Sequence, residues 1–179
     1  VVSTDGELIR DISLKYGAEV PFIRPAALSS DAADSISVIK HVVDFYSNKF
    51  DSIVLLQPTS PLRDAYAIDS AFELLQGSAN AVVSVCEVEH SPLWSNVLPE
   101  DFSMKRFIRE DVIGKRSQDL PQYYRLNGAI YISTINYFLA NNSFFGDDTK
   151  AFIMSADKSV DIDSQLDFDL AKVILNRLK

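Results

Sequence analysis

Two aspartates near the C-terminal end are the side chains best suited to chemistry in this sequence. Asp161 and Asp163 are separated by a single isoleucine, in the run Ser159-Val160-Asp161-Ile162-Asp163. In an extended strand alternate side chains share a face, so the two carboxylates would point the same way. Close like charges are unfavourable unless a cation lies between them, and carboxylate oxygens are ligands for Mg²⁺ or Mn²⁺. The pair predicts a divalent-metal site and phosphate chemistry, whereas the simpler alternative is that Asp163 or Ser164 caps the next helix.

A second candidate lies directly after a predicted buried strand. Residues 52–56 form a continuous apolar run, which is typical of a strand buried on both faces. The run ends in the loop Gln57-Pro58-Thr59-Ser60-Pro61-Leu62-Arg63. Ligands of open α/β sheets bind beyond the carboxyl ends of the strands, and the amide of Gln57 both donates and accepts hydrogen bonds. The loop is therefore predicted to line a cleft, with a stiff surface turn as the alternative.

Three other polar residues lie at predicted element ends. Arg24 follows a short strand at 20–23 and is suited to a base carbonyl or a phosphate, or is simply a solvated charge. Asp34 or Ser35 caps a predicted helix, and at Ser35 the free N–H groups of the helix start also suit an anionic or polar ligand. Asn127 precedes a strand, and with Gly128 it also fits an ordinary turn. Neither histidine nor the single cysteine has the partners of a catalytic triad or a zinc motif.

The elements that must position these residues alternate along the chain. Helices are predicted at about 8–17, 34–46, 65–75 and 166–178, with a short one after 132, and strands at 1–4, 20–23, 52–56, 81–85, 129–132 and 151–154. This alternation predicts an α/β fold with a mostly parallel sheet and helices on both faces. Residues 87–126 break the pattern and are too few for a core of their own, so they are predicted to be an insertion in a single domain, 1–179.

The composition is that of a globular domain and excludes several partners. The chain has 179 residues, of which 47% are hydrophobic and 23% charged, and its net charge is −8. No basic stripe is present to neutralise phosphates, so nucleic acid is not an expected partner. No apolar run approaches the roughly 20 residues that span a bilayer, so membrane association is not expected either. A single cysteine excludes an internal disulfide and favours a reducing, cytoplasmic location.

Five runs in a fixed order carry a resemblance to a known family. They are Val2-Ser3-Thr4-Asp5, Arg24-Pro25-Ala26-Ala27-Leu28, Leu55-Leu56 with the loop up to Arg63, Leu126-Asn127-Gly128-Ala129-Ile130-Tyr131, and Ser159 to Asp163. In these runs the chain resembles the bacterial CMP-N-acylneuraminate synthetases, the acylneuraminate cytidylyltransferases. The resemblance implies a Rossmann-like, three-layer fold of the nucleotide-diphospho-sugar transferases. It also implies an enzyme that makes a CMP-sugar and pyrophosphate from CTP and a sialic-acid-like, nine-carbon 2-keto sugar acid.

The resemblance further implies a role for each matching residue. Asp161 and Asp163 match catalytic ligands of Mg²⁺ (or Mn²⁺), and Gln57 matches a catalytic position that also lines the sugar cleft. The positions matching the nucleotide site are Arg24, Ser35 and Asn127, and those around the N-acyl group of the sugar are Tyr131, Phe144 and Phe145. The irregular stretch 87–126 matches a dimerisation arm, so a homodimer is expected.

The chain departs from the family pattern in three places. Trp94 stands where some members carry a lysine, and Ser117 stands where some carry an arginine that contacts the sugar carboxylate. Arg116, one place earlier, is then the expected sugar contact. The family's glycine-, arginine- and lysine-bearing loop, which grips the triphosphate, and the strand before it have no counterpart in residues 1–179, so a molecule that began at Val1 is expected to be inactive or nearly so. Two alternatives stay open: the same reaction on legionaminic or pseudaminic acid, or a non-catalytic fragment that binds a nucleotide or dimerises.

Overall fold

The computed structural model describes residues 1–30, 32–47 and 49–177, which group into two compact units. The first unit combines Val1–Ile53 with Thr134–Ser143, and the second combines Val54–Ser133 with the chain from Phe144 onward. The second unit contains the aspartate pair and the loop that begins at Gln57. The single-domain assignment stays a prediction.

The first unit is mainly helical. It contains α1 (Glu7–Lys15), the 3₁₀ turn η1 (Ala26–Leu28), α2 (Ser35–Tyr46) and α4 (Ile135–Asn141), which confirms the helices predicted there. Asp34 is the N-cap of α2, because its carboxylate accepts a hydrogen bond from the Ser37 N–H at 2.7 Å. The two strands predicted at 1–4 and 20–23 are wrong, since only one parallel bridge, between Thr4 and Ile23, forms there.

The sheet has four strands in the order β1-β3-β2-β4. The strands are β1 (Ser52–Leu55), β2 (Ala81–Glu87), β3 (Tyr124–Thr134) and β4 (Thr149–Met154). β2 runs parallel to β4 but antiparallel to β3, so the expected α/β class is confirmed while the sheet is mixed rather than mostly parallel. The reason is that β3 returns from the irregular excursion and not from a helical crossover, which a parallel neighbour would need.

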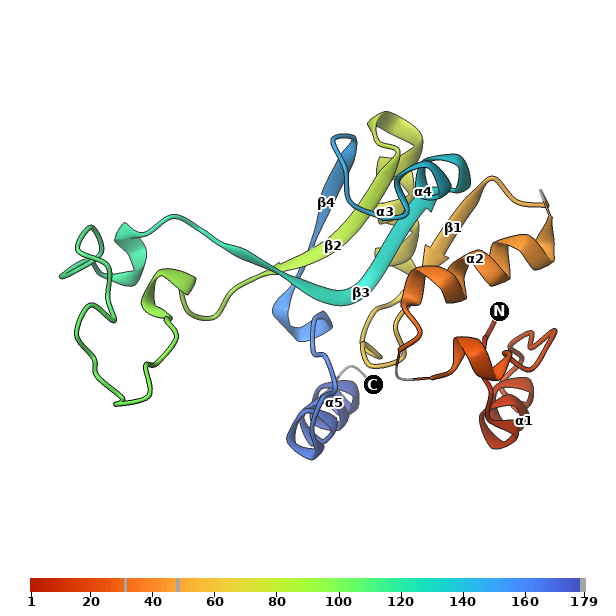
Figure 1. The fold of residues 1–179 in the computed structure, drawn as a ribbon, viewed down its shortest axis with the longest axis horizontal. Helices are drawn as coiled ribbons and strands as arrows, with labels where there is room; N and C mark the ends of the chain where they lie inside the picture. The colour runs from red at the N-terminus through yellow and green to blue at the C-terminus, as the bar shows by residue number, and fades with distance from the viewer. Residues whose placement is uncertain (31, 48, 178–179) are drawn as a thin grey trace. The chain divides into compact units, whose positions relative to one another are not determined.

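The core of the second unit lies between the sheet and α3 (Ala65–Ser78) (Figure 1). The Asp64 carboxylate caps α3 by accepting from the Ala67 N–H at 2.9 Å. Apolar residues of α3, β2, β3 and β4 share this core: Ala67, Ala71, Leu75, Val82, Ala129, Ile130, Ile132 and Met154. Each fully buried Val, Leu, Ile or Met side chain in this core contributes roughly 1.5–3 kcal/mol, so the core stabilises the packing of β2, β3 and β4 against α3. β1 differs from the prediction, because Val54 is exposed and the strand is not buried on both faces.

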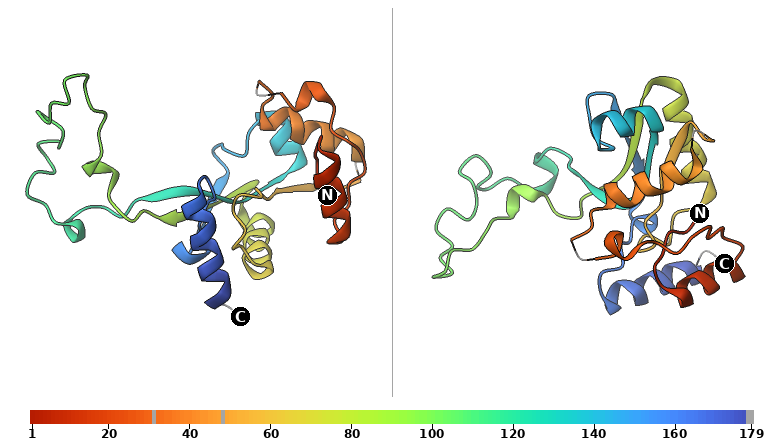
Figure 2. Two further views of the ribbon diagram at one scale, coloured as in Figure 1. Left: turned by 90° about the horizontal axis from the view of Figure 1, so that it is seen from below. Right: turned by 45° about the vertical axis from the view of Figure 1, so that its right-hand side comes forward.

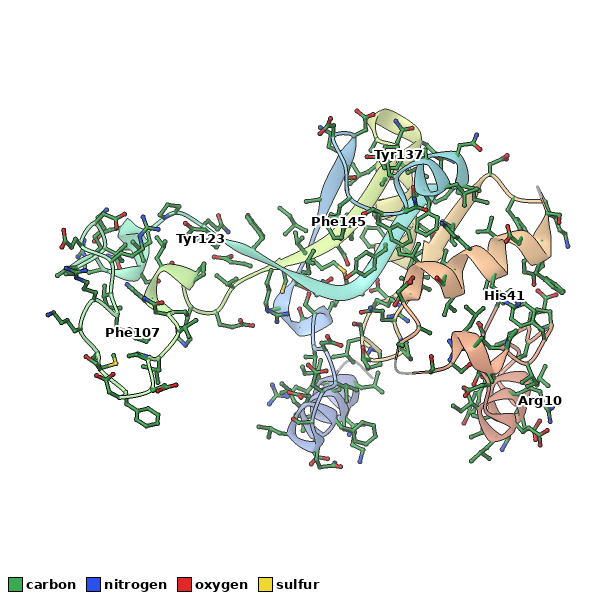
Figure 3. All side chains as sticks on the ribbon, in the orientation of Figure 1. Arg10, His41, Phe107, Tyr123, Tyr137 and Phe145 are labelled. Atoms are coloured by element: carbon green, nitrogen blue, oxygen red, sulfur yellow. The ribbon has the colours of Figure 1, made fainter. Side chains whose placement is uncertain are left out.

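The chain between β2 and β3 is irregular, as predicted. Apart from the 3₁₀ turns η2 (Pro92–Trp94) and η3 (Ser117–Asp119), it has no regular element among its described residues. Its two ends continue the antiparallel ladder, with the Val88 N–H donating to the Tyr123 carbonyl at 3.0 Å. Figures 1 and 2 show it projecting from the ends of β2 and β3, and Figure 3 places Tyr123 at its base and Phe107 within it.

The last helix, α5 (Gln165–Arg177), begins with a reciprocal cap. The Ser164 hydroxyl accepts from the Asp167 N–H at 3.4 Å, and the Asp167 carboxylate accepts from the Ser164 N–H at 2.8 Å. This confirms Ser164, and not Asp163, as the residue that starts the helix. Within residues 1–30, 32–47 and 49–177, no helix is both long and apolar enough to cross a bilayer.

Candidate active site

The site is organised around an irregularity between β2 and β3. Val83 pairs with Tyr131, whereas Val85 pairs with Leu126, so extra residues of β3 bulge out between these pairs. Gly128 lies in the bulge with φ +70°, a conformation that side chains other than glycine rarely adopt. Bulges bend a strand and redirect its side chains, and they are common beside active sites.

The loop after β1 is held against this bulge. The Arg63 guanidinium donates to the carbonyls of Gln57, at 2.7 Å, and of Ser60. Partial burial lowers the pKa of Arg63 from its usual value, because the guanidinium is partly removed from water. The fully buried Ser60 hydroxyl donates to the Asn127 carbonyl at 3.1 Å. The loop is therefore fixed by hydrogen bonds as well as by its two prolines.

Three side-chain oxygens converge on Gly128. A Cβ at this position would lie 2.5 Å from Gln57 Oε1, 3.1 Å from Ser60 Oγ and 3.6 Å from Asp161 Oδ2. Only glycine leaves room for this approach, because a methyl group would overlap the amide oxygen of Gln57. The structure thus brings together Gln57 and Asp161, which are more than a hundred residues apart in sequence.

The aspartate pair does not lie on a strand, contrary to the expectation from its alternating pattern. After β4 the chain makes the 3₁₀ turn η4 (Ala156–Lys158), and the following segment is irregular. One backbone hydrogen bond anchors it, from the Ile162 N–H to the Thr59 carbonyl at 2.8 Å. Asp161 is half-buried whereas Asp163 is exposed beside a shallow hollow, so the two carboxylates have different surroundings.

Asp161 has an unsatisfied oxygen. Its Oδ1 is buried, and none of the residues that the structure describes gives it a hydrogen bond. Leaving a buried carboxylate oxygen unpaired costs on the order of 1–3 kcal/mol or more, so the position is one that an external ligand would complete.

Asp161 also acts on two neighbours through its charge. Burial raises the pKa of the Tyr131 phenol above its usual value, and the negative charge of Asp161 raises it further. Burial lowers the pKa of Arg125, but a hydrogen bond to Glu89 at 3.2 Å and the charges of Glu89 and Asp161 outweigh it, so the net shift is upward. A cation and a phenol therefore lie within electrostatic reach of the unsatisfied carboxylate.

The three aromatic residues expected around an N-acyl group lie together. The ring of Tyr131 is 5.6 Å from that of Phe144 and 6.5 Å from that of Phe145, between centroids. Phe144 is buried and Phe145 is half-exposed; Phe145 is labelled in Figure 3. The grouping offers an apolar wall beside Asp161, while its role in sugar binding stays a prediction.

Asn127 is placed differently from a residue that contacts a ligand. It is 1% exposed, and both ends of its amide are engaged inside the protein. Its Oδ1 accepts from the Ser84 hydroxyl at 2.6 Å, and its Nδ2 donates to the Ser159 hydroxyl at 2.9 Å. In this structure its side chain holds the site together, so nucleotide binding by Asn127 stays an untested prediction.

The remaining predicted residues lie elsewhere in the chain. Arg24 and Ser35 belong to the first unit, where the Arg24 Nε donates to Ser29 Oγ at 3.0 Å and Ser35 is the exposed first residue of α2. Arg116 lies in the irregular excursion, and its guanidinium pairs with Asp119 at 3.1 Å. Their roles in nucleotide and sugar binding stay predictions.

The residues present fit a hard divalent cation whose other ligands come from a substrate. Across the described part of the chain, no three His, Cys, Asp or Glu side chains gather into a metal site of their own. Mg²⁺ is commonly held by only one or two carboxylates together with substrate phosphates and water. The unsatisfied Asp161 Oδ1 is an oxygen of the kind that such an ion takes.

Several residues of the site were not anticipated from the sequence. Ser60, Ser84, Ser159 and Arg63 each bond a partner that fixes Gln57, Asn127 or the aspartate segment. The one local signal was Ser84, a polar residue in the middle of the apolar run 81–86. A lone hydroxyl in a buried strand needs a hydrogen-bond partner, which indicates a polar neighbour across the sheet.

Comparison with known proteins gives the family. No family model matches the chain. It is 34% identical to CMP-N,N'-diacetyllegionaminic acid synthase of Legionella pneumophila, over 98% of this chain and 77% of that protein. It is 35% identical to N-acylneuraminate cytidylyltransferase of Escherichia coli, over 97% of this chain but only 41% of that protein.

A solved structure, 4-diphosphocytidyl-2C-methyl-D-erythritol synthase from Anaerococcus prevotii, superposes with a TM-score of 0.61. The match covers 97% of this chain and 78% of that chain at 12% identity, so it shows the fold alone and confirms the Rossmann-like α/β class. The identities over nearly the whole chain confirm the resemblance read from the five sequence runs. The chain belongs to the acylneuraminate cytidylyltransferases, the family of CMP-N-acylneuraminate synthetases and their legionaminic acid counterparts.

Proposed function

We propose that the protein transfers a cytidylyl group from CTP to N-acylneuraminate, a nine-carbon 2-keto sugar acid, and releases pyrophosphate. The anomeric hydroxyl of the sugar attacks the α-phosphorus, a new P–O bond forms, and the bond to the departing pyrophosphate breaks. The hydroxyl proton passes to solvent or to a nearby base. The single observation that supports this most directly is Asp161, whose Oδ1 is buried without a partner in the described chain and whose Oδ2 approaches Gly128 together with the oxygens of Gln57 and Ser60.

In the second unit, some residues would bind the sugar and others would hold the charged groups of the reaction. Gln57 offers its amide to the sugar, and the aromatic wall of Tyr131, Phe144 and Phe145 suits an acetamido methyl group. Asp161 and Asp163 would hold Mg²⁺, which when bound offsets negative charge on the phosphates. Because the chain's own groups are fixed before substrate arrives, they mainly orient the two anions.

Legionaminic acid is the second candidate substrate. The curated legionaminic acid synthase is matched over 77% of its length, whereas the Escherichia coli neuraminate enzyme is matched over 41%. The neuraminate enzymes of Streptococcus agalactiae nevertheless reach 38% identity, the highest value among these relatives. Identity in the shared region favours neuraminate, and matched length favours legionaminate.

The excursion between β2 and β3 is proposed to be a dimerisation arm. Large apolar side chains on it are exposed in the single chain: Val97, Phe102, Met104 and Ile113. Burying such residues against a second copy would remove apolar surface from water at roughly 25 cal/mol per Å². Light scattering should give twice the chain mass, and Phe102→Asp should lower it. A monomer at micromolar concentration would count against the arm. The cytoplasmic location is likewise proposed and follows from the substrates and the single thiol.

A substrate panel tests the function. The protein, with whatever sequence naturally flanks residues 1–179, is incubated with CTP, Mg²⁺ and either N-acetylneuraminate, N,N'-diacetyllegionaminate or pseudaminate, and pyrophosphate release is followed. The expected result is turnover that requires CTP and is highest with N-acetylneuraminate. Turnover highest with legionaminate selects the second candidate. Binding of CTP by calorimetry without turnover on any acid would show a nucleotide-binding module instead.

A further inference from the structure

A buried polar network joins the three parts of the site. At its centre is Asn127, which lies in the bulge of β3 and contacts groups from β2, from the loop after β1 and from the segment before Asp161. Such networks are strong only when every member is satisfied, because an unpaired buried group is costly. The network has two arms, one from each end of the Asn127 side-chain amide.

The first arm fills the bulge. Ser84 on β2 is fully buried, donates to Asn127 Oδ1 at 2.6 Å and accepts from the Ile130 N–H at 2.8 Å. Asn127 Oδ1 also accepts from the Ala129 N–H at 3.2 Å. These bonds replace the ladder hydrogen bonds that the register shift removes, so the hydroxyl of Ser84 stabilises the backbone on both sides of Gly128.

The second arm leads to the carboxylate. Asn127 Nδ2 donates to the buried Ser159 hydroxyl at 2.9 Å, and Ser159 in turn donates to the Ser155 carbonyl at 2.7 Å. The other contact of Nδ2 is the sulfur of Met154 at 3.4 Å, a weak acceptor. Ser159 is two residues from Asp161, and therefore its hydrogen bonds fix where that segment leaves η4.

We infer that Ser84 and Ser159 are positioning residues for the active site, acting through Asn127 to hold Gln57 and Asp161 in their convergent arrangement around Gly128. The inference rests on the proposed function only for its kinetic consequences. Its geometric content, the approach of Gln57 Oε1 and Asp161 Oδ2 to Gly128, is independent of any activity. Neither serine touches the reacting groups, and Asn127 is occupied by them on both sides of its amide.

The test compares Ser84→Ala and Ser159→Ala with Ser133→Ala. Ser133 is a matched control, because it is as fully buried as Ser84, lies on β3, and donates to the Asn80 carbonyl at 3.2 Å in the part of β3 that pairs with Ala81. Circular dichroism and thermal melts first establish that each variant folds. If Ser159→Ala does not fold, Ser159→Cys replaces it, since a thiol of similar shape bonds weakly.

Two readouts decide the matter. In protein labelled with ¹³C at tyrosine Cζ, the Tyr131 resonance, assigned with Tyr131→Phe, should shift in both site variants and stay unchanged in Ser133→Ala. In the pyrophosphate assay, kcat should fall by about tenfold or more in the site variants, while KM for CTP should change less than threefold. The reason is that a small displacement of the site groups lowers the rate of the chemical step more than it lowers substrate affinity. An unchanged Tyr131 resonance together with wild-type kcat, or equal losses in Ser133→Ala, would overturn the inference. If wild-type protein lacks turnover, the proposed function fails, and the Tyr131 resonance alone decides the positioning role.

Discussion

Replacing Gly128 by alanine tests the site at its tightest point. The new Cβ would lie 2.5 Å from Gln57 Oε1, and ordinary contact begins at 3.4 Å, so the amide oxygen must retreat by about 0.9 Å, the difference of the two. The Ser60 hydroxyl, at 3.1 Å, is held by its bond to Asn127 and has less freedom to move. Alanine is also strained at φ +70°, because the left-handed backbone conformation costs a residue with a Cβ about 1–2 kcal/mol.

The two costs can be separated by a control glycine. Gly114 has φ +78° and nothing within 4 Å of its own Cβ position, so Gly114→Ala carries the backbone strain without the overlap. Gly114→Ala should therefore lower the free energy of unfolding by about 1–2 kcal/mol. Gly128→Ala should lower it by a further 1–3 kcal/mol or so from overpacking. Urea unfolding followed by far-UV circular dichroism measures both values.

Activity and a second substitution complete the test. A displacement of Gln57 by about 1 Å should reduce kcat on the order of 100-fold, whereas Gly114→Ala should leave it near wild type. The double variant Gln57→Ala with Gly128→Ala lacks the side chain that clashes. It should therefore be more stable than the sum of the two single substitutions predicts, with a coupling free energy of about 0.5–3 kcal/mol. The reasoning is refuted if the two glycine variants lose equal stability and Gly128→Ala keeps its activity.

Three other outcomes follow from the same contacts. Asp161→Ala should abolish turnover yet leave the free energy of unfolding unchanged or raised, because it removes a buried oxygen with no partner in the described chain. Asp163→Ala, at an exposed position, should keep measurable turnover. A loss of stability in Asp161→Ala on urea unfolding would contradict this reasoning. Asp161→Asn should lower the pKa of Tyr131 toward its usual value, since the negative charge that raises it is gone, and ¹³C NMR titration of the phenol above neutral pH reports the direction. A hydrogen bond to Lys158 lowers the pKa of Asp64, and the same bond raises the pKa of Lys158. The stability that this pair adds should therefore be lost below about pH 4 and again above about pH 10.5. The difference in urea midpoint between wild type and Asp64→Asn should be widest near pH 7, and a difference independent of pH would argue against the pair.

Local signals in the sequence predicted most of the elements. The helix starts at Asp34 and at Ser164 were readable, because each cap bonds N–H groups only three residues away. The apolar runs at 81–85 and 151–154 predicted the strands β2 and β4. The family resemblance assigned both Gln57 and Asp161 to the catalytic site, and the structure brings an oxygen of each within 4 Å of the Cβ position of Gly128.

Contacts between distant segments were beyond local prediction. Nothing near Ser84 indicates that its hydroxyl bonds Asn127, 43 residues later, or that β3 runs antiparallel to β2. The alternating pattern from Ser159 to Asp163 predicted a strand, but a strand needs a neighbour with which to pair. In the structure the Ile162 N–H donates to the Thr59 carbonyl, and the Ser159 N–H donates to the Ala156 carbonyl within the preceding turn, so the segment stays irregular.

The contrast between Asn127 and Asp161 gives the strongest physical reason to place function here. Around Asn127 the fold satisfies the buried side-chain amide and the backbone carbonyl with four hydrogen bonds, to Ser60, Ser84, Ser159 and Ala129. Two residues beyond Ser159, Asp161 Oδ1 is buried without a partner in the described chain, although the Arg125 cation and the Tyr131 phenol are within reach of its charge. A fold that only needed stability would have paired this oxygen or replaced it, because an unpaired buried carboxylate opposes folding. An unsatisfied acceptor held in place by a satisfied network is what a site for an external cation or donor requires, and this supports the proposal that Asp161 is a ligand of the site.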